Sequence, residues 1–218
     1  MSDTGSKGVS AGQSGIVPLF ATPFATVNTG VNREFNDRLV RLCESQQTAS
    51  AVPGCDDFFA LADPLAGQLH RLILSHASGV VAGLSSAADF ARLHIQARGW
   101  CSVVSRNGHV SAQHFPGASW LAVFCAQAGE PDAGNVSAGV LRLYERRLGS
   151  VYRDATTAEL KPPFRYGNHT WTPVPGFMAL FPAHVSHEVS VVRSDTSLVL
   201  VFAMIRFVDV NAKDGGHG

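Results

Sequence analysis

Apolar residues in the first half of the chain recur at helical spacing. In residues 32–47 they lie three and four positions apart, and Asn32 is placed to cap the first turn. The same spacing returns in residues 64–76 and 85–96. The pattern therefore predicts three helices, with apolar faces that include Phe35, Leu39, Leu42 and Cys43, then Leu65, Leu69, Leu72 and Ile73, then Phe90 and Leu93.

Beyond Gly99 the pattern changes to short apolar runs separated by loops that contain Gly and Pro, which is typical of strands. Strands are predicted at 100–104, 120–125, 140–144, 177–181, 187–192 and 198–207. Near the N-terminus, the prolines of residues 16–24 favour a short extended segment. Helices followed by many strands predict a mostly β fold of the α+β class: a jelly roll or double-stranded β-helix with helices packed on one side.

One domain is expected between two polar ends. Residues 1–14 are rich in Gly and Ser and lack apolar periodicity, which predicts a disordered tail, and residues 211–218 are similar. The domain should span residues 15–210, with a helical part at about 32–96 and a β part at about 99–208. The chain has 218 residues, a length that β-barrels and sandwiches often occupy as a single unit.

The charge balance excludes some classes of partner. The chain carries 17 basic and 17 acidic residues, so it lacks the basic surface that neutralises the phosphates of nucleic acid. The polar N-terminus is not expected to act as a signal sequence, and no apolar run approaches the roughly 20 residues of a membrane span. We therefore expect a cytoplasmic protein that binds neither nucleic acid nor membrane. Its four cysteines form no C-x-x-C pair and should be buried, reduced thiols.

The strongest candidate chemistry lies between Pro175 and Val189. An apolar run enters a Phe-Pro turn and then presents His184 and His187. A β scaffold can place imidazoles at the mouth of a cavity in this way. Glu188 follows directly, but successive strand residues face opposite sides, so its carboxylate should point away from any site at His187.

A second segment with histidines, residues 108–117, lies between two predicted strands and contains His109 and His114. Metal sites in small β-barrels take one or two ligands from an early strand or loop and another from a later strand. His114 and His187 suit this arrangement. A third ligand is not evident, because neither early histidine begins an H-x-D or H-x-E motif.

From Gly99 to Phe207 the sequence resembles the 2-oxoglutarate/Fe(II)-dependent oxygenases that are related to prolyl hydroxylases. The most specific shared element is F-P-x-x-x-x-H-x-V, at residues 181–189. Further matches are Trp100, Gly108, residues 113–117 against H-x-H-P-G, residues 120–125 against W-S-G-V-Y-Y, Glu145-Arg146-Arg147 against D-P-R, and residues 17–24 against the start of the family's sequence. The resemblance implies a double-stranded β-helix, Fe(II), 2-oxoglutarate as cosubstrate, and His187 as the distal iron ligand.

The early ligand motif departs from this family. An ungapped alignment places Gln113 and Phe115 on its two early histidines, with His114 between them. Phenylalanine cannot bind a metal, and the glutamine amide is a weak, neutral ligand. Either the loop shifts by one residue, so that His114 becomes the ligand, or the metal site is degenerate. The predicted ligands are therefore His114 and His187, with Gln113 and His109 as further candidates.

The cosubstrate position departs as well. In the family an arginine about ten residues after the distal histidine pairs with the far carboxylate of 2-oxoglutarate, through a bidentate, charge-assisted contact. Position 197 is serine here. The cation could instead come from Arg193, Arg206, Arg142 or Arg147, and the preferred candidates are Arg206 on the last predicted strand and Arg147 in the segment that matches D-P-R.

Three functional hypotheses follow. The leading one is a non-haem Fe(II) oxygenase, dependent on 2-oxoglutarate, that oxidises a small molecule or an amino-acid-like substrate. The second is a metal enzyme independent of 2-oxoglutarate, with a three-histidine site chosen from His109, His114, His184 and His187. The third is a non-catalytic binding module that kept the barrel and lost the metal. Each implies a small-molecule partner, and a homodimer is the default assembly.

Overall fold

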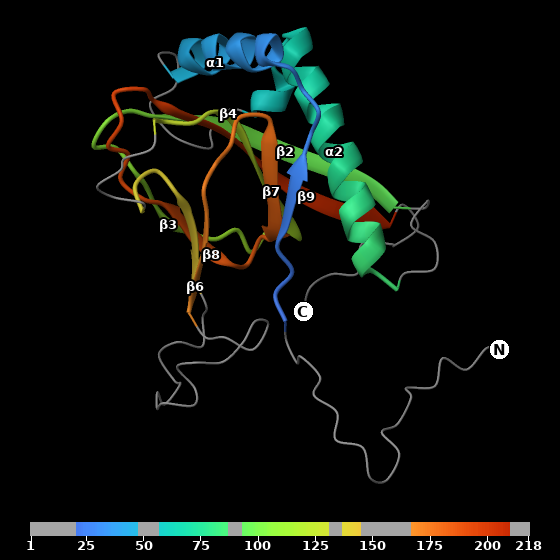
Figure 1. The fold of residues 1–218 in the computed structure, drawn as a ribbon. Coiled ribbons are helices and arrows are strands. Elements are labelled where there is room, and N and C mark those ends of the chain that lie inside the picture. Colours follow the sequence, from blue (N-terminus) through green and yellow to red (C-terminus); the bar gives the residue numbers. More distant parts are fainter. Residues whose placement is uncertain (1–20, 48–56, 87–92, 131–136, 145–166, 210–218) are drawn as a thin grey trace, which may run out of the picture.

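The structure, a computed structural model, describes residues 21–47, 57–86, 93–130, 137–144 and 167–209, which form two facing antiparallel sheets with helices over one of them (Figure 1). The larger sheet has the order β1 (Ala25–Asn28), β7 (Phe177–Pro182), β4 (Trp120–Gln127), β9 (Leu198–Asp209), β2 (Leu93–Val104). The smaller has the order β3 (Val110–Gln113), β8 (Ser186–Val189), β5 (Leu141–Tyr144), β6 (Asn168–Trp171). Successive strands cross repeatedly from one sheet to the other, so the expected double-stranded β-helix is confirmed.

The first two predicted helices are present. Helix α1 (Arg33–Gln47) begins as expected, because the side chain of Asn32 accepts a hydrogen bond from the Phe35 amide at 2.9 Å. Helix α2 (Pro64–Leu84) extends further than its apolar spacing indicated, and Asp63 caps it by accepting from the Leu65 amide at 2.8 Å. A short 3-10 helix, η1 (Phe58–Ala60), precedes α2. Both α-helices lie over the larger sheet (Figure 1).

Two apolar layers result from this arrangement. Along β9, Leu198, Leu200 and Phe202 belong to the core between the two sheets, whereas Val199 and Val201 belong to the core beneath the helices. Because β9 is covered on both faces, its sequence is apolar without interruption rather than alternating. The space between the sheets, where any barrel site must lie, is therefore contacted by alternate residues of β9.

The third predicted helix, residues 85–96, is wrong. Residues from Leu93 onward belong to β2, which pairs with β9 from Leu93↔Asp209 to Val104↔Leu198, and residues 87–92 lie outside the described part. The alternation of half-buried Leu93, Ile95 and Ala97 with exposed His94, Gln96 and Arg98 was the signal for a strand. Pairing along twelve residues outweighs the weak helical spacing of this segment.

The other predicted strands are present with shifted ends, and two short strands, β3 and β6, are additional. Each of these two strands has only four residues, so its apolar positions are too few to form a distinctive pattern. The extended segment expected at residues 16–24 overlaps the described part only from residue 21, and β1 begins just after it. The two expected tails lie outside the described residues.

The described cysteines are free thiols: Cys43 and Cys125 are buried and Cys101 is partly buried. Burial raises the pKa of the Cys125 thiol, which is therefore inert at neutral pH. Cys55 lies outside the described part. Within the described ranges, neither α-helix is long and apolar enough to span a membrane.

Candidate functional site

One row of side chains crosses the smaller sheet at the position of the predicted metal site. Gln113 of β3 pairs with His187 of β8, which pairs on its other side with Leu143 of β5, and Leu143 pairs with His169 of β6. His187 is completely buried. Paired residues of neighbouring strands point to the same face, and Leu143 is part of the core between the sheets, so this row faces the inside of the barrel.

The imidazole of His187 is held in one orientation. Its Nδ1 lies 3.0 Å from the carbonyl oxygen of Val185, so Nδ1 carries the proton and donates it, leaving Nε2 with a free lone pair. Nε2 is buried and has no hydrogen-bond partner among the described residues. Burial lowers the pKa of His187; the Val185 carbonyl opposes this shift and the nearby His114 adds to it. The buried ring is therefore neutral at pH 7.

Aromatic rings surround this imidazole. Ring centroids of Phe181, Phe115 and Phe202 lie 5.3, 5.8 and 6.5 Å from that of His187. Trp100 packs behind them, with its ring 5.0 Å from Phe115 and 5.1 Å from Phe202. The sequence pattern did not predict that Phe181, Phe202 or Trp100 would lie near His187. The imidazole therefore packs among aromatic rings, with the buried amide nitrogen of Gln113, which also lacks a hydrogen-bond partner among the described residues, on the paired position of β3.

A β-bulge decides which residue of β3 faces His187. Val110 pairs with Val189 and Gln113 pairs with His187, so three residue steps on β3 oppose two on β8. Strict alternation from the inward Val110 would turn residues 112 and 114 inward. The extra residue reverses this alternation, so Ser111 and Ala112 are both exposed, while Gln113 is half-buried.

The bulge removes His114 from the site. Its side chain is exposed, whereas Phe115 on the next position turns inward onto His187. His109 and His184 are exposed too. The structure therefore does not bring His114 or His109 together with His187 as ligands, and the three-histidine alternative has no support. Across the described ranges, no three His, Cys, Asp or Glu side chains gather closely enough to hold a metal ion.

The residues at this position do not fit an Fe(II) centre. They offer one imidazole from His187, one neutral amide from Gln113 and the phenyl ring of Phe115. His187 alone has the set-up of a ligand, because its Nδ1 is held by a carbonyl and its Nε2 is free. Non-haem iron sites of this kind need two histidines and a carboxylate, and the described residues that face His187 supply neither a second histidine nor a carboxylate. The one-residue loop shift that would have made His114 a ligand is absent, because Gln113 is the residue in register with His187.

Of the two predicted cosubstrate arginines, the structure describes only Arg206. Arg206 is exposed near the end of β9, and Arg147 lies outside the described residues. The backbone carbonyl of Ser197 accepts a hydrogen bond from Gln127 Nε2 at 2.9 Å. The prediction for Glu188 is confirmed, because its carboxylate turns away from His187 and pairs with Arg142 at 2.8 Å.

Comparison with solved structures identifies this architecture. A prolyl-4-hydroxylase of Pseudomonas putida superposes with a TM-score of 0.55 at 14% identity, covering 84% of this chain and 87% of that one. The fold is that of the 2-oxoglutarate/Fe(II) oxygenases. AviO1 of Streptomyces viridochromogenes has a TM-score of 0.53 at 16% identity, over 90% of this chain and 94% of that one. The viral collagen prolyl hydroxylase of Paramecium bursaria Chlorella virus-1 has a TM-score of 0.53 at 9% identity, over 92% and 100%.

Comparison of the sequence alone gives a different result from comparison of the structure. No family model and no curated protein matches it. The resemblance noted from the F-P-x-x-x-x-H-x-V element is thus confirmed at the level of the oxygenase fold. At these identities the likeness carries the fold, and the chemistry has to be argued from the residues of this chain.

The neutral His187 predicts how stability depends on pH. Its folded pKa is lowered from an unfolded value of about 6.5, so the unfolded state binds more protons below that pH. The free energy of unfolding should reach its full value above about pH 6.5, where His187 is neutral in both states. It should fall as the pH drops through the unfolded pKa of His187. His187→Gln should flatten this fall in urea titrations at about pH 7.5 and pH 5.

Burial also lowers the pKa of His70, so some acid sensitivity should remain in the His187→Gln variant. Adding His70→Gln should remove more of it. An unchanged pH dependence in His187→Gln would show that this imidazole is solvated rather than buried.

Proposed function

We propose that this chain is a binding module that uses the oxygenase fold without iron-dependent oxidation. One observation carries the proposal: the positions that face His187 inside the barrel hold Gln113 and Phe115. A glutamine amide and a phenyl ring replace the donors that an iron centre requires. This is the third of the hypotheses drawn from the sequence.

The surroundings of His187 support the same proposal. Three phenylalanine rings lie within 6.5 Å of its ring centroid, where a metal, a cosubstrate and oxygen would need room. The serine at position 197 adds to this, because a neutral residue there cannot pair with the far carboxylate of 2-oxoglutarate. The ligand positions and the cosubstrate arginine position differ independently from those of an oxygenase, and both differences support a binding module without iron-dependent oxidation.

Iron-dependent oxygenation of a small molecule is the second candidate. The oxygenase fold and the free Nε2 of His187 favour it. In that case Fe(II) would supply the oxidising chemistry, and 2-oxoglutarate would be the cosubstrate. The candidate needs at least two further ligands beside His187, and the described residues around its ring do not supply them.

Metal analysis separates the two candidates. Protein purified with added Fe(II) is expected to contain no stoichiometric iron, and it should release no succinate from 2-oxoglutarate above a blank without protein. Near-stoichiometric iron that disappears in His187→Ala would overturn the proposal in favour of an iron enzyme. Iron without succinate release would favour a metal enzyme independent of 2-oxoglutarate.

A further inference from the structure

A cavity of about 480 Å³ lies at the end of the barrel away from the Gln113 and His187 row. It is lined by Leu198 at the start of β9 and by residues of three loops, at 128–130, 138–140 and 172–175, together with 192–194. The row Val110, Val189, Leu141 and Trp171 separates it from the row that contains His187. The cavity is therefore distinct from the position of the iron site in the oxygenase fold.

The cavity has the size and lining of a small-molecule site. Ligand pockets commonly measure about 300–1,000 Å³ and are mostly apolar with a few polar groups. Val140, Val192 and Leu198 form a floor that is 1–2% exposed. Alanines and glycines at 128, 129, 138 and 139 form much of the wall, which leaves space that larger side chains would fill. Such a lining suits the hydrocarbon part of a ligand.

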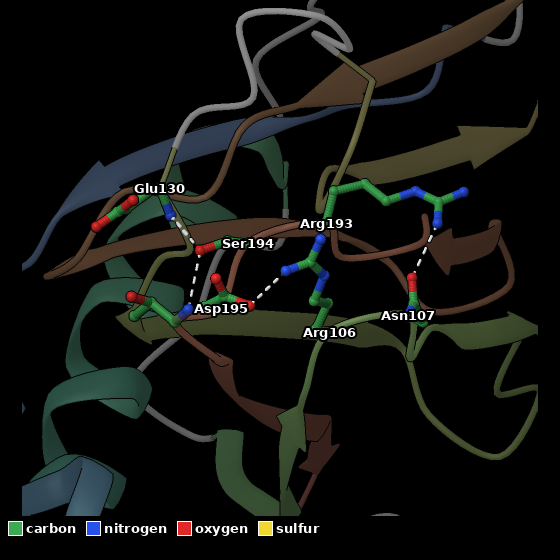
Figure 2. Close-up of polar contacts among 7 residues, drawn as sticks. Arg106, Asn107, Glu130, Arg193, Ser194 and Asp195 are labelled. Carbon is green, nitrogen blue, oxygen red and sulfur yellow. Dashed lines mark hydrogen bonds and ion pairs between the residues drawn. The ribbon is translucent and has the colours of Figure 1, made fainter.

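Hydrogen bonds fix the loops around this cavity. The Ser194 hydroxyl oxygen accepts from the amides of Glu130 and Thr196, both at 3.0 Å (Figure 2). On the adjoining loop, the Val140 amide donates to the Ser190 hydroxyl at 3.0 Å, and the Ser190 amide donates to the Val140 carbonyl at 2.9 Å. Loops held in this way are ordered before a ligand arrives, which lowers the entropic cost of binding.

Arg193 is the one cation among the described residues that line the cavity, and its side chain is exposed. Its Nη1 donates to the neutral amide oxygen of Asn107 at 2.9 Å, so this contact leaves its charge uncompensated. The neighbouring Arg106 differs, because it forms an ion pair with Asp195 at 2.6 Å. Figure 2 shows the Glu130 carboxylate on the far side of Ser194, turned away from Arg193. Arg193 thus has donors left for a carboxylate.

We propose that this cavity binds a small apolar monocarboxylate. The hydrocarbon part occupies the apolar floor, and the carboxylate is bound by Arg193 at the mouth. A dicarboxylate would need polar partners at the floor for its second charged group, which Val140, Val192 and Leu198 do not offer. The inference rests on the proposed function, because it gives the binding module a ligand class.

Titration with three compounds of one shape and different charge tests the assignment. Phenylacetate, phenylacetamide and phenethylamine are added separately to the full chain, and binding is followed by calorimetry and by amide chemical shifts. Phenylacetate is expected to bind most tightly. Arg193→Gln should weaken it roughly tenfold, to the level of the amide, because a charge-assisted hydrogen bond is lost. Arg106→Gln is the matched control, since it removes an exposed arginine of the same end that is already paired, and it should leave binding unchanged.

A second variant tests the cavity itself. Ala138→Leu places a larger side chain in the wall and should abolish binding of phenylacetate, with circular dichroism confirming that the variant is folded. Tightest binding of phenethylamine would overturn the assignment in favour of Glu130 as the recognising group. Equal binding of all three compounds, or binding of none, would also overturn it. All three results leave the proposed function intact, because that depends on iron content and succinate release.

Discussion

The double variant Gln113→His, Phe115→Asp is expected to bind a divalent metal more tightly than the wild-type chain does. It places a histidine in register with His187 and a carboxylate on the next inward position, which completes the donor set of a non-haem iron site. Loss of a group that merely orients a metal ligand costs about 10–100-fold in affinity. Gain of two ligands should therefore raise the affinity for Co(II) by roughly 100-fold or more, measured by calorimetry.

The same residue types placed one position away form the control. Ala112 and His114 are both exposed, so Ala112→His, His114→Asp adds the same donors on the outer face. This variant should show no gain in affinity. Stronger metal binding by the 112 and 114 variant than by the 113 and 115 variant would contradict the bulge in β3 and the register of the site.

Thermal unfolding gives a second measurement for the restored site. A carboxylate beside the aromatic rings should destabilise the metal-free double variant, because a buried charge is left unpaired. Metal binding to the folded state should then raise its melting temperature, roughly with the logarithm of the metal concentration once this exceeds the dissociation constant. The wild-type melting temperature should not respond to Co(II).

Phe202→Ala is expected to cost about 3–5 kcal/mol in the free energy of unfolding, which is typical of removing a fully buried phenylalanine. The ring is 0% exposed, lies parallel to Trp100 with an interplanar angle of 2°, and contacts the His187 ring. Its removal leaves a cavity between the sheets that the neighbouring strands, fixed by hydrogen bonds on both sides of β9, cannot close. Urea denaturation measures the loss.

Two substitutions calibrate this result. Phe202→Leu keeps most of the apolar volume and should cost less than Phe202→Ala. Val208→Ala, on the exposed end of the same strand, should stay within about 0.5 kcal/mol of wild type. A loss below about 1 kcal/mol for Phe202→Ala would mean that the barrel interior is open rather than packed, and would restore room for a cosubstrate.

The region around β3 shows why the site could be predicted only in part. The ungapped alignment placed Gln113 and Phe115 on the two early ligand positions, and in the structure both face His187, yet His114 was the preferred candidate because histidine binds metal and glutamine rarely does. A bulge adds one residue without leaving a pattern in a four-residue strand, and that residue determines which side chains face inward. Only the pairing with β8 reveals it.

The segment from Leu93 to Gln96 shows a different limit. Its apolar residues fit both a helical and a strand spacing, and the helical spacing of residues 85–96 led to the prediction of a helix. The twelve-residue pairing with β9 decides for the strand. Local preference is a fraction of a kcal/mol per residue, which a long ladder and a covered face exceed.

The sequence alone determined the class of fold, the capping of α1 and the retention of His187, because apolar periodicity and the F-P-x-x-x-x-H-x-V element are local features. The tertiary structure decided that His187 faces Gln113 and aromatic rings, and that a cavity lies at the opposite end. Both depend on residues brought together from strands and loops far apart in the chain, through register and packing that no single segment encodes.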